Sequence, residues 1–161
     1  MNDEKQIRWV GSACDDLLGF PKDVRKEAGF QLGKVQAGLD PADWKREEGK
    51  EMKIDTKIRH VTKPGANLFL ELGFTPAEAK RLQAASRKQI NDTRLLKRQL
   101  MEELSVWIAA HHLKQTEAAE ILMVSRPRVS DVVNKKTAKF TIDTLVEMLS
   151  RVGKPVKLAI S

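Results

Sequence analysis

The stretch that decides the fold is LKQTEAAEILMVSRPRVSDVVNK, residues 113–135. A first short helix is predicted from small and apolar residues that share one face: Ala118, Ala119 and Leu122. The two alanines allow another helix to approach closely. A turn follows at Met123-Val124, and Ser125 is a favourable N-cap for a second helix. The stretch therefore predicts two short helices joined by a tight turn.

The second helix begins directly after Ser125. Pro127 is tolerated in its first turn because the missing N–H would be unpaired there in any case. A buried stripe is predicted at the i, i+3, i+4 positions Val129, Val132 and Val133. The opposite face offers hydrogen-bond donors. This pattern is typical of a helix-turn-helix, whose second helix enters the DNA major groove.

The donors on that face predict a DNA-binding site. Arg126 and Arg128 can each form a bidentate pair with guanine, worth about 1–3 kcal/mol of discrimination. Ser130 and Asn134 could bond to base edges or phosphates, and Lys135 and Lys136 would lie near the phosphates that flank the groove. Gln115, in the first helix, would bond a phosphate or brace the second helix. Asp131 is interpreted as a brace for a neighbouring arginine. The predicted site is Gln115, Thr116, Ser125, Arg126, Pro127, Arg128, Ser130, Asn134, Lys135 and Lys136.

The same segment resembles the Cro/repressor (XRE) helix-turn-helix family. More closely, it resembles the HigA-like antitoxins of the host-inhibition-of-growth type, which are DNA-binding partners of RelE-like toxins. The resemblance covers about residues 54–160 and rests on four segments: ANLFLELGF (66–74), KQTEAAEIL (114–122), VSRPRVSDVVNKK (124–136) and FTIDTLVEML (140–149). It implies a lambda-repressor-like fold, a homodimer, and the operator of a toxin–antitoxin operon as the target.

Two positions depart from the family pattern. Met123 stands where the turn usually has glycine, so a positive φ there predicts strain. Lys114 stands where the first helix usually has Ser or Thr as its cap. Both departures predict a less stable pair of helices.

The positive charge is concentrated in the part of the chain that holds the motif. The chain has 161 residues, of which 41% are apolar and 32% charged, and its net charge is +7. Residues 1–51 hold 9 Lys and Arg against 11 Asp and Glu, a net −2, whereas residues 52–161 hold 20 against 11, a net +9. A phosphate-binding surface requires this kind of excess.

Other chemistry is sparse. The single cysteine, Cys14, excludes an internal disulfide and suits a reducing cytoplasm. No apolar run reaches the roughly 18 residues of a membrane span, and MNDEKQIRWV lacks the apolar core of a signal peptide. No ligand spacing repeats around the three histidines, His60, His111 and His112. We therefore expect no catalytic residues, metal or cofactor.

The N-terminal part carries a second resemblance. IRWVGSACDDLLGFPKDVRKEAGFQLGKVQAGLDPADWK (7–45) predicts a strand followed by two helices, the second from Pro21 to Gly38 with Val24 and Val35 on one face. It is similar to the first third of RelE/ParE-superfamily toxins of the phage-derived, HigB-like group. Their catalytic groups lie on later strands, which have no counterpart in the pattern here.

The predicted organisation is a truncated toxin-like fragment (1–45), a linker (46–65) and a helix-turn-helix domain (66–161). The domain is mainly α. Before the helix-turn-helix, we predict a short helix to Leu72, a helix from a Thr75–Glu78 capping box to Ser86, and a long helix from Asn91 or Asp92 to His111. After it, we predict a last helix capped by Thr141. A terminal strand at 156–160 could pair with its copy in a dimer.

Taken together, these patterns predict a cytoplasmic, antitoxin-like transcriptional regulator that binds double-stranded DNA as a homodimer. A RelE- or HigB-like toxin is a possible partner, and no membrane is involved. One alternative is a protein that neutralises a toxin without binding DNA. The other is a ribosome-dependent mRNA endonuclease. It would need basic or histidine side chains on a multistranded sheet after Lys45, and we expect the sequence to lack them.

Overall fold

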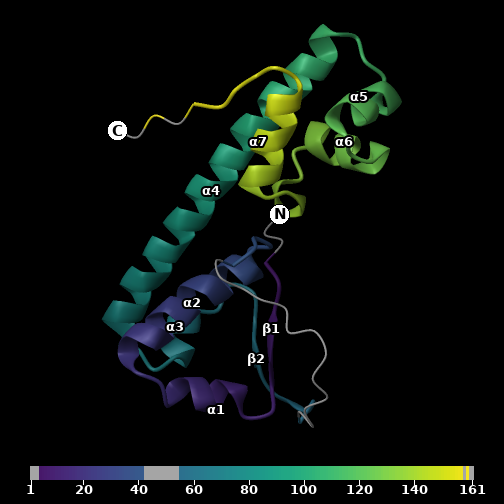
Figure 1. Ribbon diagram of the computed structural model, residues 1–161. Coiled ribbons are helices and arrows are strands. Elements are labelled where there is room, and N and C mark those ends of the chain that lie inside the picture. Colours follow the sequence, from purple (N-terminus) through teal and green to yellow (C-terminus); the bar gives the residue numbers. More distant parts are fainter. Residues whose placement is uncertain (1–3, 42–54, 158, 160–161) are drawn as a thin grey trace. The chain divides into compact units, whose positions relative to one another are not determined.

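The computed structural model describes residues 4–41, 55–157 and 159. The chain is mainly helical, as predicted (Figure 1). Its elements are β1 (Ile7–Val10), α1 (Ala13–Leu18), α2 (Lys22–Gln36), β2 (Ile58–Thr62), α3 (Leu68–Glu71), α4 (Pro76–Ala110), α5 (Gln115–Leu122), α6 (Arg126–Val133), the 3₁₀ turn η1 (Thr137–Lys139) and α7 (Ile142–Arg151). The chain divides into two compact units, Met1–Ile90 and Asn91–Ser161.

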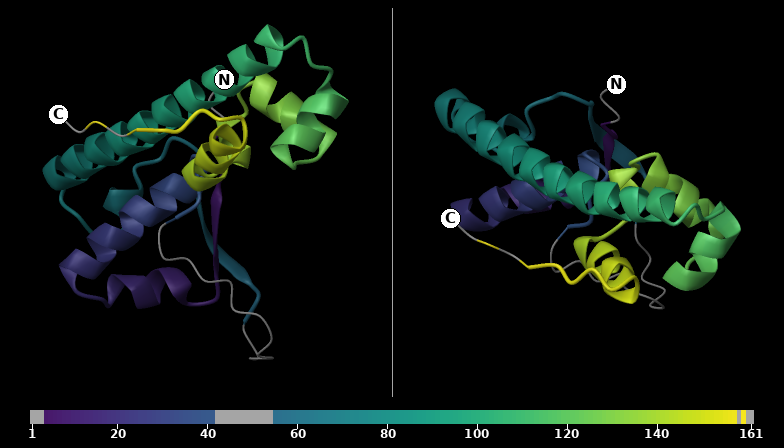
Figure 2. Two further views of the ribbon diagram at one scale, coloured as in Figure 1. Left: turned by 45° about the horizontal axis from the view of Figure 1, so that its top comes forward. Right: turned by 90° about the horizontal axis from the view of Figure 1, so that it is seen from above.

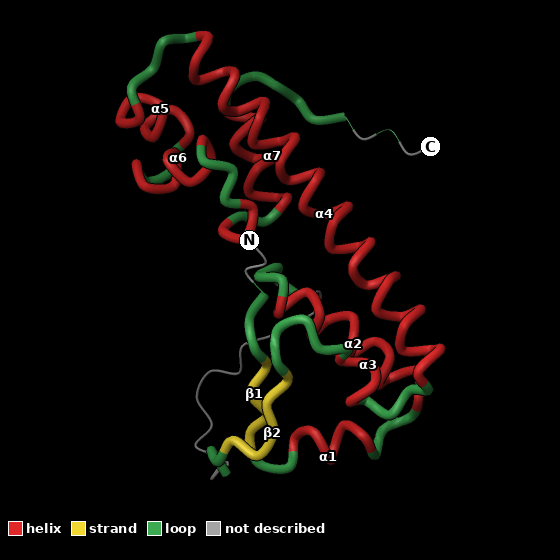
Figure 3. Tube along the Cα trace, turned by 180° about the vertical axis from the view of Figure 1, so that it is seen from behind, coloured by secondary structure: helices red, strands yellow, loops and turns green. Residues whose placement is uncertain are grey.

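The first unit contains a two-stranded antiparallel sheet made of β1 and β2 (Figure 3). Trp9 of β1 pairs with His60 of β2. The Trp9 indole donates a 2.9 Å hydrogen bond to the buried hydroxyl of Thr62. The prediction of a linker over 46–65 is therefore wrong for residues 58–62. Three of these five residues are β-branched and favour a strand, and β1 supplies its partner. Part of the predicted linker, residues 46–54, lies outside the described residues.

The core of the first unit is apolar and rich in aromatic rings. Phe69 packs edge-on against Phe30 and Phe74, with centroids 5.5 Å and 6.0 Å away. The two helices predicted after the first strand are confirmed as α1 and α2. However, α2 turns Gly29 toward the core, while Val24 and Val35 are exposed. The buried residues of this core are Trp9, Leu68, Phe69, Leu72, Phe74, Ala79 and Leu82.

A side-chain cap begins α3, and the predicted capping box begins α4. The Asn67 carboxamide oxygen accepts the Phe69 N–H at 3.1 Å. In the capping box, Glu78 accepts the Thr75 N–H at 3.3 Å, and the Thr75 hydroxyl oxygen accepts the Glu78 N–H at 3.4 Å.

The predicted break between Ser86 and Asn91 is wrong, because α4 continues as one helix to Ala110 (Figure 2). The segment RKQIND (87–92) contains neither glycine nor proline. Asn and Asp inside a helix cost only about 0.7 kcal/mol each relative to alanine, so a cap-forming residue alone does not end a helix. The N-terminal part of α4 packs in the first unit, so residues 66–90 lie in the unit that holds the toxin-like segment.

The second unit is built from the C-terminal part of α4 with α5, α6 and α7. Arg151 donates a 2.7 Å hydrogen bond to the Leu122 carbonyl, which satisfies an acceptor at the end of α5. Thr141 caps α7 by accepting the Thr144 N–H at 3.2 Å, as predicted. The buried residues of this core include Leu100, Leu104, Ile108, Ala118, Leu122, Val129, Val132, Leu145 and Met148.

The predicted C-terminal strand does not form in residues 152–157 or at 159, and its other positions lie outside the described residues. Val156 instead packs against the core of the second unit. A short alternating segment needs a neighbouring strand for its backbone hydrogen bonds, and the described part of this unit contains none.

The turn between α5 and α6 confirms the strain predicted at Met123. Its φ is +51° and its ψ +45°, in the left-handed region, and its side chain is 74% exposed. At the other end of α5, Lys114 provides no side-chain cap, as predicted. Glu117 partly compensates by accepting the Lys114 N–H at 2.7 Å.

We predict that Met123→Gly raises the free energy of unfolding by about 1 kcal/mol. An L residue in the left-handed region costs about 1–2 kcal/mol, part of which is offset by the greater freedom of glycine in the unfolded chain. Urea denaturation measures the change. Met123→Ala is the control, because it shortens the same exposed side chain and keeps the strain. An equal gain in both variants would contradict this explanation.

Candidate nucleic-acid interface

One side of helix α6 packs against the core of its unit, and the N-terminal end of the helix is exposed to solvent. Val129 and Val132 have no exposed surface and pack in the core with Ala118 of α5. Ser125 has the extended backbone of an N-cap, although its hydroxyl makes no capping hydrogen bond. The exposed residues at this end are Ser125, Arg126, Pro127 and Arg128. The packing therefore leaves the first turn of α6 free to meet a ligand.

The two predicted arginines differ in their surroundings. The Arg126 guanidinium makes no hydrogen bond or ion pair with any described residue. The Arg128 guanidinium lies 4.6 Å from the ring centroid of the buried Phe140, a cation–π contact that restricts its orientation. Neither charge is neutralised by a described carboxylate. Together with the positive end of the helix dipole, they make this end of α6 attractive to anionic or acceptor groups.

Four of the other predicted side chains lie on α5 or in the later part of α6. Gln115 and Thr116 are exposed in the first turn of α5, and neither makes a side-chain hydrogen bond to a described residue of α6. Asn134 donates to the Ser130 carbonyl at 2.8 Å and to its hydroxyl at 3.2 Å. Ser130 and Asn134 therefore already bond to each other at the end of α6.

Lys135 is held by its own protein. It has a φ of +55° just after α6, and its ammonium pairs with Glu102 and donates to the Ser105 hydroxyl at 3.3 Å. Both partners lie on α4, and the Lys135 side chain is only 26% exposed. Its side chain therefore stabilises the attachment of α6 to α4.

Asp131 does not brace an arginine, which corrects that interpretation. It takes a nearly buried position, 8% exposed, whereas Val133, expected to be buried, is 42% exposed. The Asp131 carboxylate pairs with Lys136 at 3.0 Å and with Lys139 at 2.8 Å. Hydrogen bonds from Lys139 and then Lys136 hold the pKa of Asp131 below its ordinary value. Attraction to two lysines keeps this carboxylate on the inner side of the helix.

Lys139 is a candidate DNA contact that the sequence analysis missed. It lies in η1, and its side chain is 57% exposed beside that of Lys136, which is 53% exposed. The available signal was the run KKTAK (135–139), which places three lysines directly after the second helix. The Asp131 carboxylate brings two of them, Lys136 and Lys139, together.

A short helix, a left-handed turn and a second helix with a cationic, exposed N-terminus define a helix-turn-helix DNA-binding domain. A family model described as a helix-turn-helix domain matches residues 68–161, which is more than half of the chain. The chain therefore belongs to this helix-turn-helix family, a class of DNA-binding regulators. Searches of curated proteins and of solved structures gave no significant match.

The first unit carries a separate polar cluster that involves the sheet. The His60 imidazole nitrogen lies 3.0 Å from a Glu71 carboxylate oxygen, which also accepts a hydrogen bond from the Thr62 hydroxyl. Arg59, also on β2, pairs with Asp55 at 2.6 Å. Basic and histidine side chains thus do occur on a sheet after Lys45, which corrects the sequence argument against such groups.

The cysteine near that cluster is not poised for reaction. Burial, followed by the charges of Asp15 and Glu71, raises the pKa of the Cys14 thiol, which favours its protonated and less nucleophilic form. Within the described ranges, no group of three or more His, Cys, Asp or Glu side chains is arranged to hold a metal ion. None of the described helices combines the length and apolar character needed to cross a membrane.

We predict that the stability contributed by Asp131 depends on pH. Because its pKa is lowered in the folded state, this contribution is present above the unfolded value of about 3.9 and is lost as pH falls through the folded value. Asp131→Asn should therefore lower the thermal unfolding midpoint at pH 7, and the deficit should shrink at acidic pH. Glu120→Gln, at an exposed site on α5, is the control. A deficit that stays constant down to pH 2 would rule out the ionic explanation.

Proposed function

We propose that this protein is a sequence-specific transcriptional regulator of antitoxin type, which acts in the cytoplasm as a homodimer on operator DNA. The observation that carries the proposal is the exposed N-terminal end of α6, where Arg126 and Arg128 have no described acidic partner. This end of the second helix is the part of a helix-turn-helix that contacts base edges. Arginine is also the side chain best suited to bidentate recognition of guanine.

In the proposed complex, the first turn of α6 enters the major groove. Arg126 is free to adapt to a base, whereas the contact of Arg128 with Phe140 limits the positions that Arg128 can reach. Lys136 and Lys139 follow α6 and would contact phosphates beside the groove. Two copies of the motif would bind half-sites about one helical turn, roughly 34 Å, apart.

The proposed target is the operator of the protein's own toxin–antitoxin operon. Two resemblances support it: the HigA-like pattern over residues 54–160 and the toxin-like pattern over residues 7–45. The proposed protein partner is a RelE- or HigB-like toxin. The contacts of α6 support the proposed binding of DNA only. The proposed binding of a toxin therefore needs its own experiment.

We predict that replacing Arg126 and Arg128 together with Gln lowers the affinity for DNA from upstream of the protein's own gene roughly tenfold or more. Each good bidentate pair is worth about 1–3 kcal/mol, and 1.4 kcal/mol is a factor of ten. Fluorescence anisotropy at several salt concentrations measures the affinity. The affinity for a scrambled duplex should fall less, because that complex loses the attraction of two charges but no base-specific pair.

The matched control replaces Arg98 and Lys157 with Gln, which removes the same two charges from exposed positions outside α6. It should retain the preference for the upstream DNA. If the wild-type protein bound both duplexes equally, only nonspecific attraction would remain. If the α6 variant bound the upstream DNA as tightly as the wild-type protein, the first turn of α6 would not be the recognition site. If the wild-type protein bound neither duplex, toxin neutralisation without DNA binding would be the better account.

We further propose that the protein is not an enzyme, although His60 and Glu71 form a pair that could exchange a proton. The purified protein should leave mRNA intact in the presence of ribosomes, as judged by primer extension. Cleavage by the wild-type protein that His60→Ala abolished would instead favour the endonuclease function. Cleavage that survived this substitution would indicate a contaminating nuclease.

A further inference from the structure

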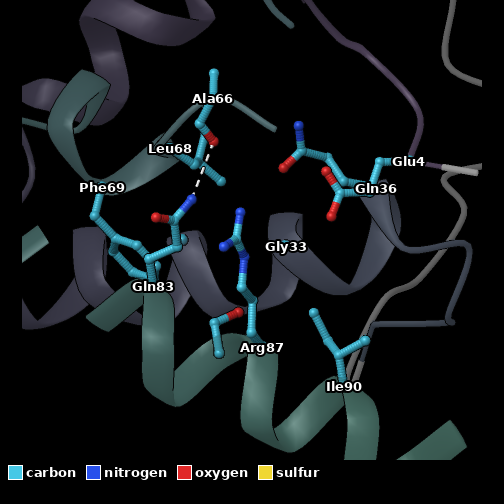
Figure 4. Close-up of a pocket in the computed structure, with 11 residues that line it drawn as sticks. Glu4, Gly33, Gln36, Ala66, Leu68, Phe69, Gln83, Arg87 and Ile90 are labelled. Carbon is cyan, nitrogen blue, oxygen red and sulfur yellow. Dashed lines mark hydrogen bonds between the residues drawn. The ribbon is translucent and has the colours of Figure 1, made fainter. Parts of the chain in front are cut away.

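The first unit contains a small cavity between α2, the segment around α3 and the N-terminal part of α4 (Figure 4). Its volume is about 40 Å³. This is room for roughly three water-sized groups. Gly33 keeps α2 close to α4, since a Cβ there would lie 2.8 Å from the Ser86 hydroxyl oxygen. The polar side chains that line the cavity are Glu4, Gln36, Gln83, Ser86 and Arg87.

One of these side chains is buried without a partner. Gln36 is 8% exposed, and its amide nitrogen makes no hydrogen bond to any described residue. A buried N–H donor that lacks an acceptor is unfavourable and uncommon in folded proteins. The carboxamide of Gln36 faces the cavity in Figure 4. The cavity therefore presents a donor that an occupant could satisfy.

A second donor converges on the same space. The Arg87 guanidinium lies between the amides of Gln83 and Gln36 in Figure 4 and makes no ion pair with a described residue. Gln83 is already engaged, because its amide donates to the Ala66 carbonyl at 3.4 Å. Arg87 is exposed on α4, so the cavity is accessible from solvent on its side. One buried unpartnered donor, the Gln36 amide, and one solvent-accessible cation, the Arg87 guanidinium, therefore line the same cavity.

We propose that this cavity binds a carboxylate group, held by the Arg87 guanidinium and the Gln36 amide. A carboxylate has three heavy atoms, which matches the room available, and its two oxygens fit the planar guanidinium in a bidentate pair. Water could satisfy Gln36, but only an anion would satisfy Gln36 and pair with the charge of Arg87 at the same time. The remainder of the ligand extends past Arg87 into solvent, so the carboxylate belongs either to a small organic acid or to the C-terminus of a peptide.

Glu4 opposes this binding and provides a further test. Its carboxylate lines the cavity and accepts the Gly65 N–H at 2.8 Å. A negative charge at this position repels a bound anion. Glu4→Gln should therefore tighten carboxylate binding, because glutamine keeps an acceptor for Gly65 and removes the charge.

The experiment is NMR titration of the nitrogen-15-labelled full chain with sodium acetate, against sodium chloride at equal ionic strength. The Gln36 side-chain amide and the Arg87 Nε–H signals should shift saturably with acetate and not with chloride. Arg87→Gln should abolish the saturable shift of Gln36. Arg81→Gln, an exposed arginine on α4 that does not line the cavity, should leave it unchanged. Gln36→Leu should weaken binding, and its circular dichroism spectrum establishes that it folds.

Two short peptides, one with a free and one with an amidated C-terminus, distinguish the sources of the carboxylate. Tighter binding of the free-acid peptide than of acetate assigns the cavity to a peptide end, and the reverse assigns it to a small acid. Shifts that are linear, equal in chloride or retained in Arg87→Gln would overturn the proposal and leave the cavity to water. The outcome is independent of DNA binding, because no residue of α6 takes part.

Discussion

The burial of Val129 and Val132 is the constraint on which the rest of the candidate site depends. Both side chains have no exposed surface, so they fix which side of α6 packs against the core of its unit. Burying both valines allows only one rotation of α6 about its axis, and at that rotation the first turn of the helix is exposed to solvent. Arg126 and Arg128 are consequently exposed although no local interaction pushes them outward. The position of these two cations therefore follows from the packing of Val129 and Val132 and not from an ion pair.

The basic residues after that first turn do not all serve the same purpose. Lys135 bonds to Glu102 and Ser105, and so secures the end of α6 to α4. Lys136 and Lys139 remain half-exposed but share the Asp131 carboxylate. An exposed surface rich in lysine thus contains one structural ion pair and one positioned pair of cations. The composition of the segment cannot separate these roles, because each depends on a carboxylate brought close by the fold.

The sequence predicts local features well and distant pairings poorly. The positive φ of Met123 and the capping box of Thr75 and Glu78 were both predictable, since each depends on a few neighbouring residues. Strand β2 was missed because its partner β1 lies about fifty residues earlier in the chain. The continuity of α4 was missed because a cap-forming residue was taken as a helix start. The inward position of Asp131 requires lysines whose distance from it only the folded chain defines.

The pairing of Asp131 with two lysines has a consequence for selectivity among polyanions. The three groups together carry a single net positive charge, shared by two ammonium groups that have a carboxylate between them. A phosphate can gain one of these lysines only by competing with that carboxylate, so weak and poorly aligned contacts gain little. Binding of a polyanion to these lysines should then release fewer counterions from the polyanion than the number of basic side chains suggests. This corner of the protein should therefore adhere less readily to RNA, heparin or any other chain of negative charges.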